Sequence, residues 1–422
     1  MFAIRSKRTG VVAAAVAAVL ALWLGVPSSA AATTTSFIGV GSKMVAMTVS
    51  GGRYIYVAKT GSDSVSQYQP WAHGNVSYGR YNCLSDPNYI ESGVSSQTVC
   101  PEPTASAPLA TIQLAVRVAR PGDVIVVRAG VYSEAIGWSA VRGTASAPIV
   151  MEANPGERVD IDGTLIMRSP DYWTIQGFHF NYNRAIQSGQ AVVALAGGQH
   201  WNFINNEVDG SAGVANLLIE SDTATSSTVA AKTAAAPSGF NVSGNCIHTN
   251  NGNDAQGTDH NIYMMSSIYS TGGMIEHNFL AGAPRGSNIK AAASSPSTAS
   301  DSPNNVLIAY NTMLYAASGV TVGLSAQGIS IEHNLIALPM QSQSNDGAIK
   351  TYQLAAPGKN AVKDTLLYGY ASAIHEDFGV TSHIFTARNV STPVSFTGSV
   401  ANCSVKPTSS TILNQYGQYA GQ

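Results

Sequence analysis

The chain has very little charge for its length. Only 11% of its 422 residues are Asp, Glu, Lys or Arg, against about 25% in an average globular protein. With 22 basic and 24 acidic residues the net charge is −2, and there is no basic excess that could neutralise the phosphates of a nucleic acid. The hydrophobic content of 45% excludes a disordered chain, and the low charge excludes a long coiled coil.

Long apolar runs are absent after the first 30 residues or so. Residues 5–8 carry three positive charges, residues 11–26 are apolar and rich in Ala, and residues 28–32 are small. This pattern predicts a secretory signal peptide over residues 1–31, with an uncleaved anchor as the alternative. We therefore expect a secreted, extracellular protein with no membrane contact. Removal of the signal changes the net charge from −2 to −5, so an acidic ligand would need a local basic site.

Cysteine is also scarce, with four residues in the chain. An even number in an exported protein favours disulfides. Cys83 and Cys100 flank a polar loop and are the predicted pair, whereas Cys246 is interpreted as a small buried residue. No Cys-x-x-Cys or paired His spacing is present, so the sequence predicts no zinc site.

The main feature that the sequence does contain is a repeat. Alternating apolar residues are followed by Asn, any residue and an apolar residue, with the Asn at positions 206, 245, 278, 311 and 334. Alternation with a period of two predicts short strands, and Asn suits the turn that ends each of them. The spacings of 39, 33, 33 and 23 residues are too irregular for a propeller and indicate a solenoid with loops of different length.

The start of the solenoid also has a recognisable pattern. Apolar residues at i, i+3, i+4 and i+7 predict an amphipathic helix over residues 111–120, which Pro121-Gly122 ends. A strand follows at residues 123–127. Because a solenoid must cover its open end, we expect this helix to form a cap.

Five segments near the N-terminus resemble the opening coils of secreted right-handed parallel β-helix proteins of the pectate lyase superfamily. They are residues 54–63, 108–115, 120–132, 143–149 and 155–163. The resemblance implies an all-β, right-handed parallel β-helix with a short N-terminal capping α-helix. It further implies one domain over residues 32–422, with a cap region at about 52–125, coils at about 123–400 and a tail from about 401. The superfamily includes polysaccharide lyases, many with a Lys or Arg base and several with calcium, as well as glycosidases, epimerases and non-catalytic proteins.

The strands that follow the Asn turns align with one another. We align residues 215–218, 260–263, 287–290, 319–322, 347–350 and 372–375. The third column is mostly Ile or Leu and should point inward, so its neighbours point outward. The fourth column contains Leu218, Tyr263, Lys290, Val322, Lys350 and His375.

This alignment places a phenol and an amine on adjacent coils, about 4.8 Å apart at the backbone. Lys290 and Tyr263, with His260 and Arg285 beside them, suit β-elimination on a uronic acid. That reaction needs a base for the proton next to the carboxylate, a positive charge on the carboxylate and an acid for the leaving oxygen. Which of Lys290, Tyr263 and His260 is the base stays open.

Further residues are predicted to hold the substrate or a metal. The predicted substrate-binding residues are Asn216, Asn261, Asn288, Lys350 and His375. Glu220, Asp254 and Asp259 could supply oxygen ligands to Ca²⁺, although no calcium-loop motif is present.

The function predicted from these observations is that of a secreted, monomeric polysaccharide lyase acting on an acidic, uronate-containing polymer. One alternative is a β-helix glycoside hydrolase, which needs two carboxylates; Glu376 and Asp377 are the adjacent acidic pair. An epimerase shares the proton abstraction. The third alternative is a non-catalytic carbohydrate-binding or cell-surface protein.

Overall fold

The computed structural model describes residues 53–63, 69–73, 76–80, 83–84, 98–99, 104–139, 141–182, 190–251, 259–295, 300–340, 347–354, 359–377, 384–389 and 393–420. The predicted signal peptide, Asp254 and the Cys100 half of the predicted disulfide lie outside these residues. The three described helices have at most seven residues each, and none of them is long and apolar enough to cross a membrane.

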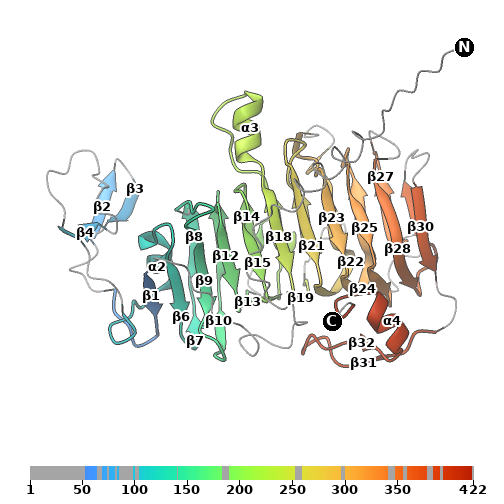
Figure 1. Cartoon of the computed structure of the whole chain (residues 1–422), viewed down its shortest axis with the longest axis horizontal. Helices are drawn as coiled ribbons and strands as arrows, with labels where there is room; N and C mark the ends of the chain where they lie inside the picture. The colour runs from blue at the N-terminus through green and yellow to red at the C-terminus, as the bar shows by residue number, and fades with distance from the viewer. Residues whose placement is uncertain are drawn as a thin grey trace, which may run out of the picture. The chain divides into compact units, whose positions relative to one another are not determined.

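The chain winds into a right-handed parallel β-helix whose coils each contribute to three sheets (Figure 1). Sheet 1 contains β1 (Tyr54–Val57), β6 (Val124–Val127), β9 (Ile149–Ala153), β12 (Trp173–Gln176), β15 (Asn202–Ile204), β18 (Ser238–Ser243), β21 (Gly272–Glu276), β23 (Val306–Ala309), β25 (Ser330–Glu332) and the first halves of β28 (Ala361–Tyr368) and β30 (Ile384–Asn389). All of these pairings are parallel, which confirms the predicted fold class.

The other two sheets follow in each coil. Sheet 2 contains β7 (Gly130–Tyr132), β10 (Val159–Ile161), β13 (His179–Asn181), β16 (Glu207–Asp209), β19 (Cys246–His248), the first halves of β22 (Phe279–Ala291) and β24 (Thr312–Gly323), β26 (Leu335–Ala337), and the second halves of β28 and β30. Sheet 3 contains β8 (Ala135–Ser139), β11 (Thr164–Arg168), β14 (Ala191–Ala196), β17 (Ala215–Glu220), β20 (His260–Met265), the second halves of β22 and β24, β27 (Ile349–Tyr352) and β29 (Ile374–Asp377).

Alternate residues of each strand point into the solenoid, as the period of two predicts. In sheet 3 the inward column is almost fully buried and contains Leu217, Ile262, Ile289, Val320 and Ile349. These residues belong to one apolar core that continues through all three sheets. The outward columns are therefore the positions where side chains can meet a ligand.

The repeated Asn residues form a buried ladder at the turn between sheets 1 and 2. The amide Nδ2 of Asn245 donates to Oδ1 of Asn278 (2.9 Å), and the same bond recurs from Asn278 to Asn311 and on to Asn334. The left-handed residue of each turn is the one before the Asn, such as His277 with φ 53°. The Asn itself is selected because its amide satisfies backbone groups inside the core, not because it tolerates a positive φ.

Two short helices lie at the ends of the described solenoid. Helix α2 (Ile112–Val118) begins at the predicted residue, with the Thr111 hydroxyl accepting from the N–H of Leu114 (3.3 Å), and packs across β1, β6 and β8 as the expected cap. Helix α4 (Ser410–Gln415) belongs to the C-terminal tail, which we define as residues 393–420 and which includes the paired strands β31 (Phe396–Thr397) and β32 (Lys406–Pro407).

The C-terminal tail packs along the outer face of sheet 2 (Figure 1). Its Cys403 forms a disulfide with Cys246 of β19, so the interpretation of Cys246 as an unbonded buried residue is wrong. The remaining elements are α3 (Val229–Ala235), which interrupts a segment expected to be a loop, and the small pairs β2 (Gln69–His73) with β3 (Val76–Arg80) and β4 (Cys83–Leu84) with β5 (Thr98–Val99).

Candidate active site on sheet 3

The predicted register of the candidate site is confirmed. Strand β20 pairs with β22 so that Ile262 lies beside Ile289 and Tyr263 lies beside Lys290. The two Ile side chains are buried in the core, so the phenol and the amine project from the outer face. The ammonium nitrogen of Lys290 lies 4.6 Å from the centroid of the Tyr263 ring.

Lys290 has the electrostatic properties of a base. Burial, and then the positive charge of Lys350, lower the pKa of Lys290 to about 8. An ordinary lysine, with a pKa near 10.4, is almost entirely protonated at neutral pH. The ring face of Tyr263 acts in the opposite direction, because a cation–π contact stabilises the ammonium form.

Tyr263 is less suited to proton transfer than the sequence suggested. Its side chain is nearly buried and its hydroxyl donates to the carbonyl oxygen of Ala293 (3.1 Å). Burial is the main cause that raises the pKa of Tyr263 far above its usual value. The phenol therefore stays protonated and its hydrogen is already bound, so the ring serves chiefly to support Lys290.

His260 lies beneath this pair and is also buried. Its Nδ1 accepts the N–H of Ser287 (3.0 Å), and its ring lies 5.5 Å from that of Tyr263. Burial and then the charge of Lys290 hold the pKa of His260 well below its usual value, so the imidazole is neutral. Its Nε2 is buried and has no hydrogen-bond partner within the described part of the chain.

Arg285 is held at the edge of the site by Asp259. The backbone N–H of Arg285 donates to Oδ2 of Asp259 (3.2 Å), and its Nε lies 3.7 Å from Oδ1. The Asp259 side chain is fully buried, whereas about a third of the Arg285 side chain is exposed. The guanidinium is thus the accessible member of the pair, and the carboxylate positions it.

The three Asn residues predicted to bind substrate form a second internal ladder. Asn216 donates to Oδ1 of Asn261 (2.9 Å), which donates in turn to Oδ1 of Asn288 (2.7 Å). All three side chains are fully buried, and each also donates to a backbone carbonyl of sheet 2. The ladder shapes the turn between sheets 2 and 3, and it does not reach the outer face.

The outer column beyond Lys290 differs from the predicted one at a single position. Strand β24 pairs so that Thr321, not Val322, lies beside both Lys290 and Lys350. Val322 pairs with Ala291 and is buried in the core. His375 follows Lys350 in the same column, as predicted.

The residues proposed for calcium do not form one site. Glu220 ends β17 and pairs with Met265, which is six residues after Asp259 along the neighbouring chain segment. At about 3.3 Å per residue the two carboxylates are about 20 Å apart, whereas Ca²⁺ needs ligands at about 2.3–2.6 Å. Asp259 is in addition engaged by Arg285. The described residues therefore do not fit the predicted calcium site, and we assign no step to a metal on sheet 3.

Tyr352 is a residue of this face that the alignment missed. It lies two residues beyond Lys350 and pairs with Gly323, where any side chain would collide with the Tyr352 ring. Burial raises the pKa of Tyr352 to about 12. Extending the corrected register by two residues would have found it, because a Gly opposite an aromatic residue marks a place where a ring crosses the neighbouring strand.

Comparisons with known proteins give one local match in sequence. No known family model matches the chain. The pectate lyase PEL9 of Emericella nidulans is 44% identical over 68 residues, which are 16% of this chain and 17% of that enzyme. The matched segment thus covers only about a sixth of either protein.

Solved structures resemble the chain more broadly but less closely. Pectate lyase Pel9A shares 13% identity, with a TM-score of 0.48 over 78% of this chain and 80% of that one. A lacto-N-biosidase from Eubacterium ramulus shares 11% identity, with a TM-score of 0.41 over 80% and 67%. Because both scores are below 0.5, these likenesses do not select an activity.

Proposed function

We propose that the protein is a secreted polysaccharide lyase that cleaves an acidic, uronate-containing polymer by β-elimination on the outer face of sheet 3. The observation that carries the proposal is Lys290, a lysine on an outer strand whose pKa is lowered to about 8 and which lies over the Tyr263 ring. The local match to a pectate lyase and the signal-like N-terminus agree with it.

The proposed reaction needs one proton to move. Neutral Lys290 takes the proton from the carbon next to the carboxylate, the electron pair forms a carbon–carbon double bond, and the bond to the leaving glycosidic oxygen breaks. The protonated Lys290 is then the nearest acid for that oxygen. The substrate carboxylate must be neutralised while charge develops, and Lys350, which already acts on Lys290 through space, and the exposed Arg285 supply positive charge.

A screen against uronate polymers tests this function. We expect the purified protein to generate unsaturated products, which are followed by the ultraviolet absorbance of the new double bond. The Lys290→Ala variant should lose about 10²- to 10⁴-fold in kcat, the usual contribution of a general acid or base. Lys363→Ala is the matched control, since Lys363 is an exposed lysine of β28 bound to Glu332 (2.8 Å).

The role of Tyr263 is tested separately. Tyr263→Phe keeps the ring beneath Lys290 and should retain most activity, whereas Tyr263→Leu removes the ring and should reduce it. Loss of activity in Tyr263→Phe comparable to that in Lys290→Ala would make the phenol the proton donor. Full activity in Lys290→Ala would contradict the proposed base.

A glycoside hydrolase is the second candidate, and Glu220 is the observation that favours it. Burial, together with the negative charges of Asp222 and Asp301, raises the pKa of Glu220 despite the opposing effect of Arg168, and a raised pKa is what a general acid requires. Hydrolysis would release reducing ends without an ultraviolet-absorbing product. It would also be abolished by Glu220→Gln and spared by Lys290→Ala. Binding of a polymer with neither product would indicate a non-catalytic protein.

A further inference from the structure

A group of ionisable side chains lies on the outer face of sheet 2, away from the proposed active site. His179 of β13, Glu207 and Asp209 of β16 and His248 of β19 come from three successive coils. The strands pair so that His179 lies beside Glu207 and Asp209 lies beside His248. The four side chains are only 6–15% exposed, so this is a nearly buried polar group on the outside of an apolar core.

The distances between the four side chains match those around one metal ion. Nε2 of His179 lies 3.4 Å from Oδ2 of Asp209 and 3.9 Å from Oε1 of Glu207. Nε2 of His248 lies 3.4 Å from the same Glu207 oxygen and 3.6 Å from the same Asp209 oxygen. A regular tetrahedron with ligands about 2.1 Å from its centre has edges of about 3.4 Å. The two imidazoles and two carboxylates thus converge on a common centre.

Each of the four side chains is also fixed by a second contact on its far side. Nδ1 of His179 lies 2.6 Å from Oδ1 of Asp160, and Nδ1 of His248 lies 2.8 Å from the Thr249 hydroxyl. When His179 carries its proton on Nδ1, it donates to Asp160 and turns the lone pair of Nε2 toward the carboxylates. This carboxylate–histidine arrangement is the usual outer shell of a metal ligand.

The two carboxylates are held in the same way. Nη1 of Arg158 donates to Oε2 of Glu207 (3.1 Å), and Nδ2 of Asn181 donates to Oδ1 of Asp209. In both residues the bonded oxygen is the one that does not face the histidines. The free oxygens of Glu207 and Asp209 therefore remain directed at the common centre.

The charges of the cluster leave room for a divalent cation. Asp160, Glu207 and Asp209 contribute three negative charges, and Arg158, which contacts Asp160, Glu207 and the His179 ring, contributes one positive charge. With both imidazoles neutral, two negative charges remain in a nearly buried place, where uncompensated charge is costly. Either two imidazolium protons or one divalent cation can balance them.

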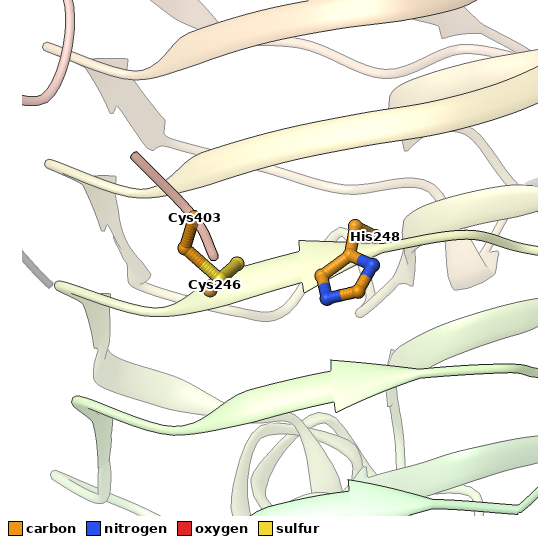
Figure 2. Close-up of side chains that lie close together, drawn as sticks. All are labelled: Cys246, His248 and Cys403. Carbon is orange, nitrogen blue, oxygen red and sulfur yellow. A yellow bond between two sulfur atoms is a disulfide. The ribbon is translucent and has the colours of Figure 1, made fainter. Parts of the chain in front are cut away.

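We propose that His179, Glu207, Asp209 and His248 form a zinc-binding site on sheet 2. Two imidazole nitrogens and two carboxylate oxygens in tetrahedral array suit Zn²⁺, whereas Ca²⁺ takes six or more oxygen ligands. Figure 2 shows His248 on the same face of β19 as the Cys246–Cys403 disulfide. The two sulfurs near His248 are bonded to each other, so they are not ligands, and they anchor the C-terminal tail beside the site. The site would fasten three coils together, and it is independent of the reaction proposed for sheet 3.

Metal binding by the whole protein tests the proposal. The protein is stripped with EDTA, dialysed, and titrated with Zn²⁺ or Ca²⁺ by calorimetry, and its metal content is measured by mass spectrometry. We expect one Zn²⁺ per chain, a rise in Tm with Zn²⁺ and no such rise with Ca²⁺. Co²⁺ in the same site should give the intense visible absorption of a tetrahedral complex. Because the histidines must be neutral to bind, affinity should fall as the pH is lowered.

Variants distinguish the site from other zinc-binding groups. Asp160→Asn should weaken Zn²⁺ binding about 10- to 100-fold, as expected for an outer-shell partner, and Asp209→Asn and His179→Gln should weaken it more. Glu157→Gln is the matched control, because Glu157 is also a carboxylate held by an arginine, Arg128 (2.7 Å). If the unaltered protein binds no Zn²⁺, or Asp209→Asn and His179→Gln bind it unchanged, the proposal is overturned and the cluster is a metal-free ion network. Should the single variants fail to fold, the stoichiometry and Co²⁺ spectrum of the unaltered protein decide.

Discussion

The outer faces of sheets 2 and 3 have the same backbone geometry but opposite surroundings. From β19 onward the outer column of sheet 2 is apolar, with Cys246, Phe279, Leu335 and Leu366 fully buried. The C-terminal tail covers these residues. In the same coils the outer column of sheet 3 contains Lys290, Thr321, Lys350 and His375, and three of these four are partly exposed.

This difference shows how one scaffold separates stability from binding. Apolar outer residues on sheet 2 bury area under the tail, at roughly 25 cal/mol per Å², and contribute to folding. Polar outer residues on sheet 3 remain available to a ligand, and Lys290 costs stability because burial disfavours its charge. The four predictions below test this contrast, from the largest expected effect to the smallest.

The largest effect concerns the covered face. The Cys246–Cys403 disulfide closes a loop of 157 residues, for which the chain-entropy model gives about 5 kcal/mol. We expect the double variant Cys246→Ser/Cys403→Ser to lose about 3–5 kcal/mol of unfolding free energy, measured by guanidinium denaturation. Adding a reductant should destabilise the native protein but not the double variant. An unchanged unfolding midpoint in the double variant would show that the tail needs no anchor.

The second effect separates structure from binding beneath the open face. Asn261→Ala removes the amide that bonds Asn216, Asn288 and the Ala281 carbonyl. Buried groups left unsatisfied cost about 1–3 kcal/mol each, so we expect a loss of about 3 kcal/mol and no specific rise in KM. The half-buried Asn202, which donates to Thr174 (3.2 Å), is the control for a less critical amide. A tenfold rise in KM at unchanged stability would instead restore Asn261 as a substrate contact.

The third prediction concerns the cost of the proposed base. Lys290 has a pKa of about 8 in the folded state against about 10.4 in the unfolded chain. The unfolded state therefore binds more protons between these values, and stability should rise with pH from about 8 to about 10.4. Below pH 8 the cost is constant. Lys290→Met should then stabilise the protein at pH 7 by about 1–2 kcal/mol, after allowance for partial exposure, and the gain should vanish above pH 10.4.

Thermal unfolding across this pH range measures the effect. Lys363→Met, on the exposed lysine of β28, is the matched control and should give no pH-dependent gain. If Lys290→Met destabilises the protein at pH 7, the lysine is a structural cation stabilised by Tyr263 and not a strained base.

The sequence predicted the solenoid because its signals are local. Alternation, the Asn turns and the Thr111 cap each depend on a few neighbouring residues, and each is confirmed. The register slipped at Thr321 because Val320 and Val322 are both apolar and either could point inward. Here the strand pairing, not the residue pattern, selects the inward residue.

The features that the sequence missed all depend on distant coils. Cys403 reaches Cys246 only because the C-terminal tail runs back along sheet 2, and connectivity of this kind cannot be deduced from spacing. The same is true of His179 and His248, which show no paired His spacing because stacking, not sequence, brings them together. Glu220 and Asp259 failed in the opposite way: they are on adjacent strands but at different heights along them.

The smallest effect tests whether the open face acts as one electrostatic unit. Lys350 is the second cause, after burial, of the lowered pKa of Lys290, so Lys350→Met should raise that pKa by a few tenths of a unit, and added salt should do the same. The rising limb of kcat/KM with pH, near 8 in the native enzyme, should shift upward by the same amount, because the base must be neutral. The chemical shift of reductively methylated Lys290 gives the pKa without a substrate. Lys363→Met should leave both readings unchanged. If Lys350→Met does not move either of them, burial alone sets the pKa of Lys290 and the two lysines act independently.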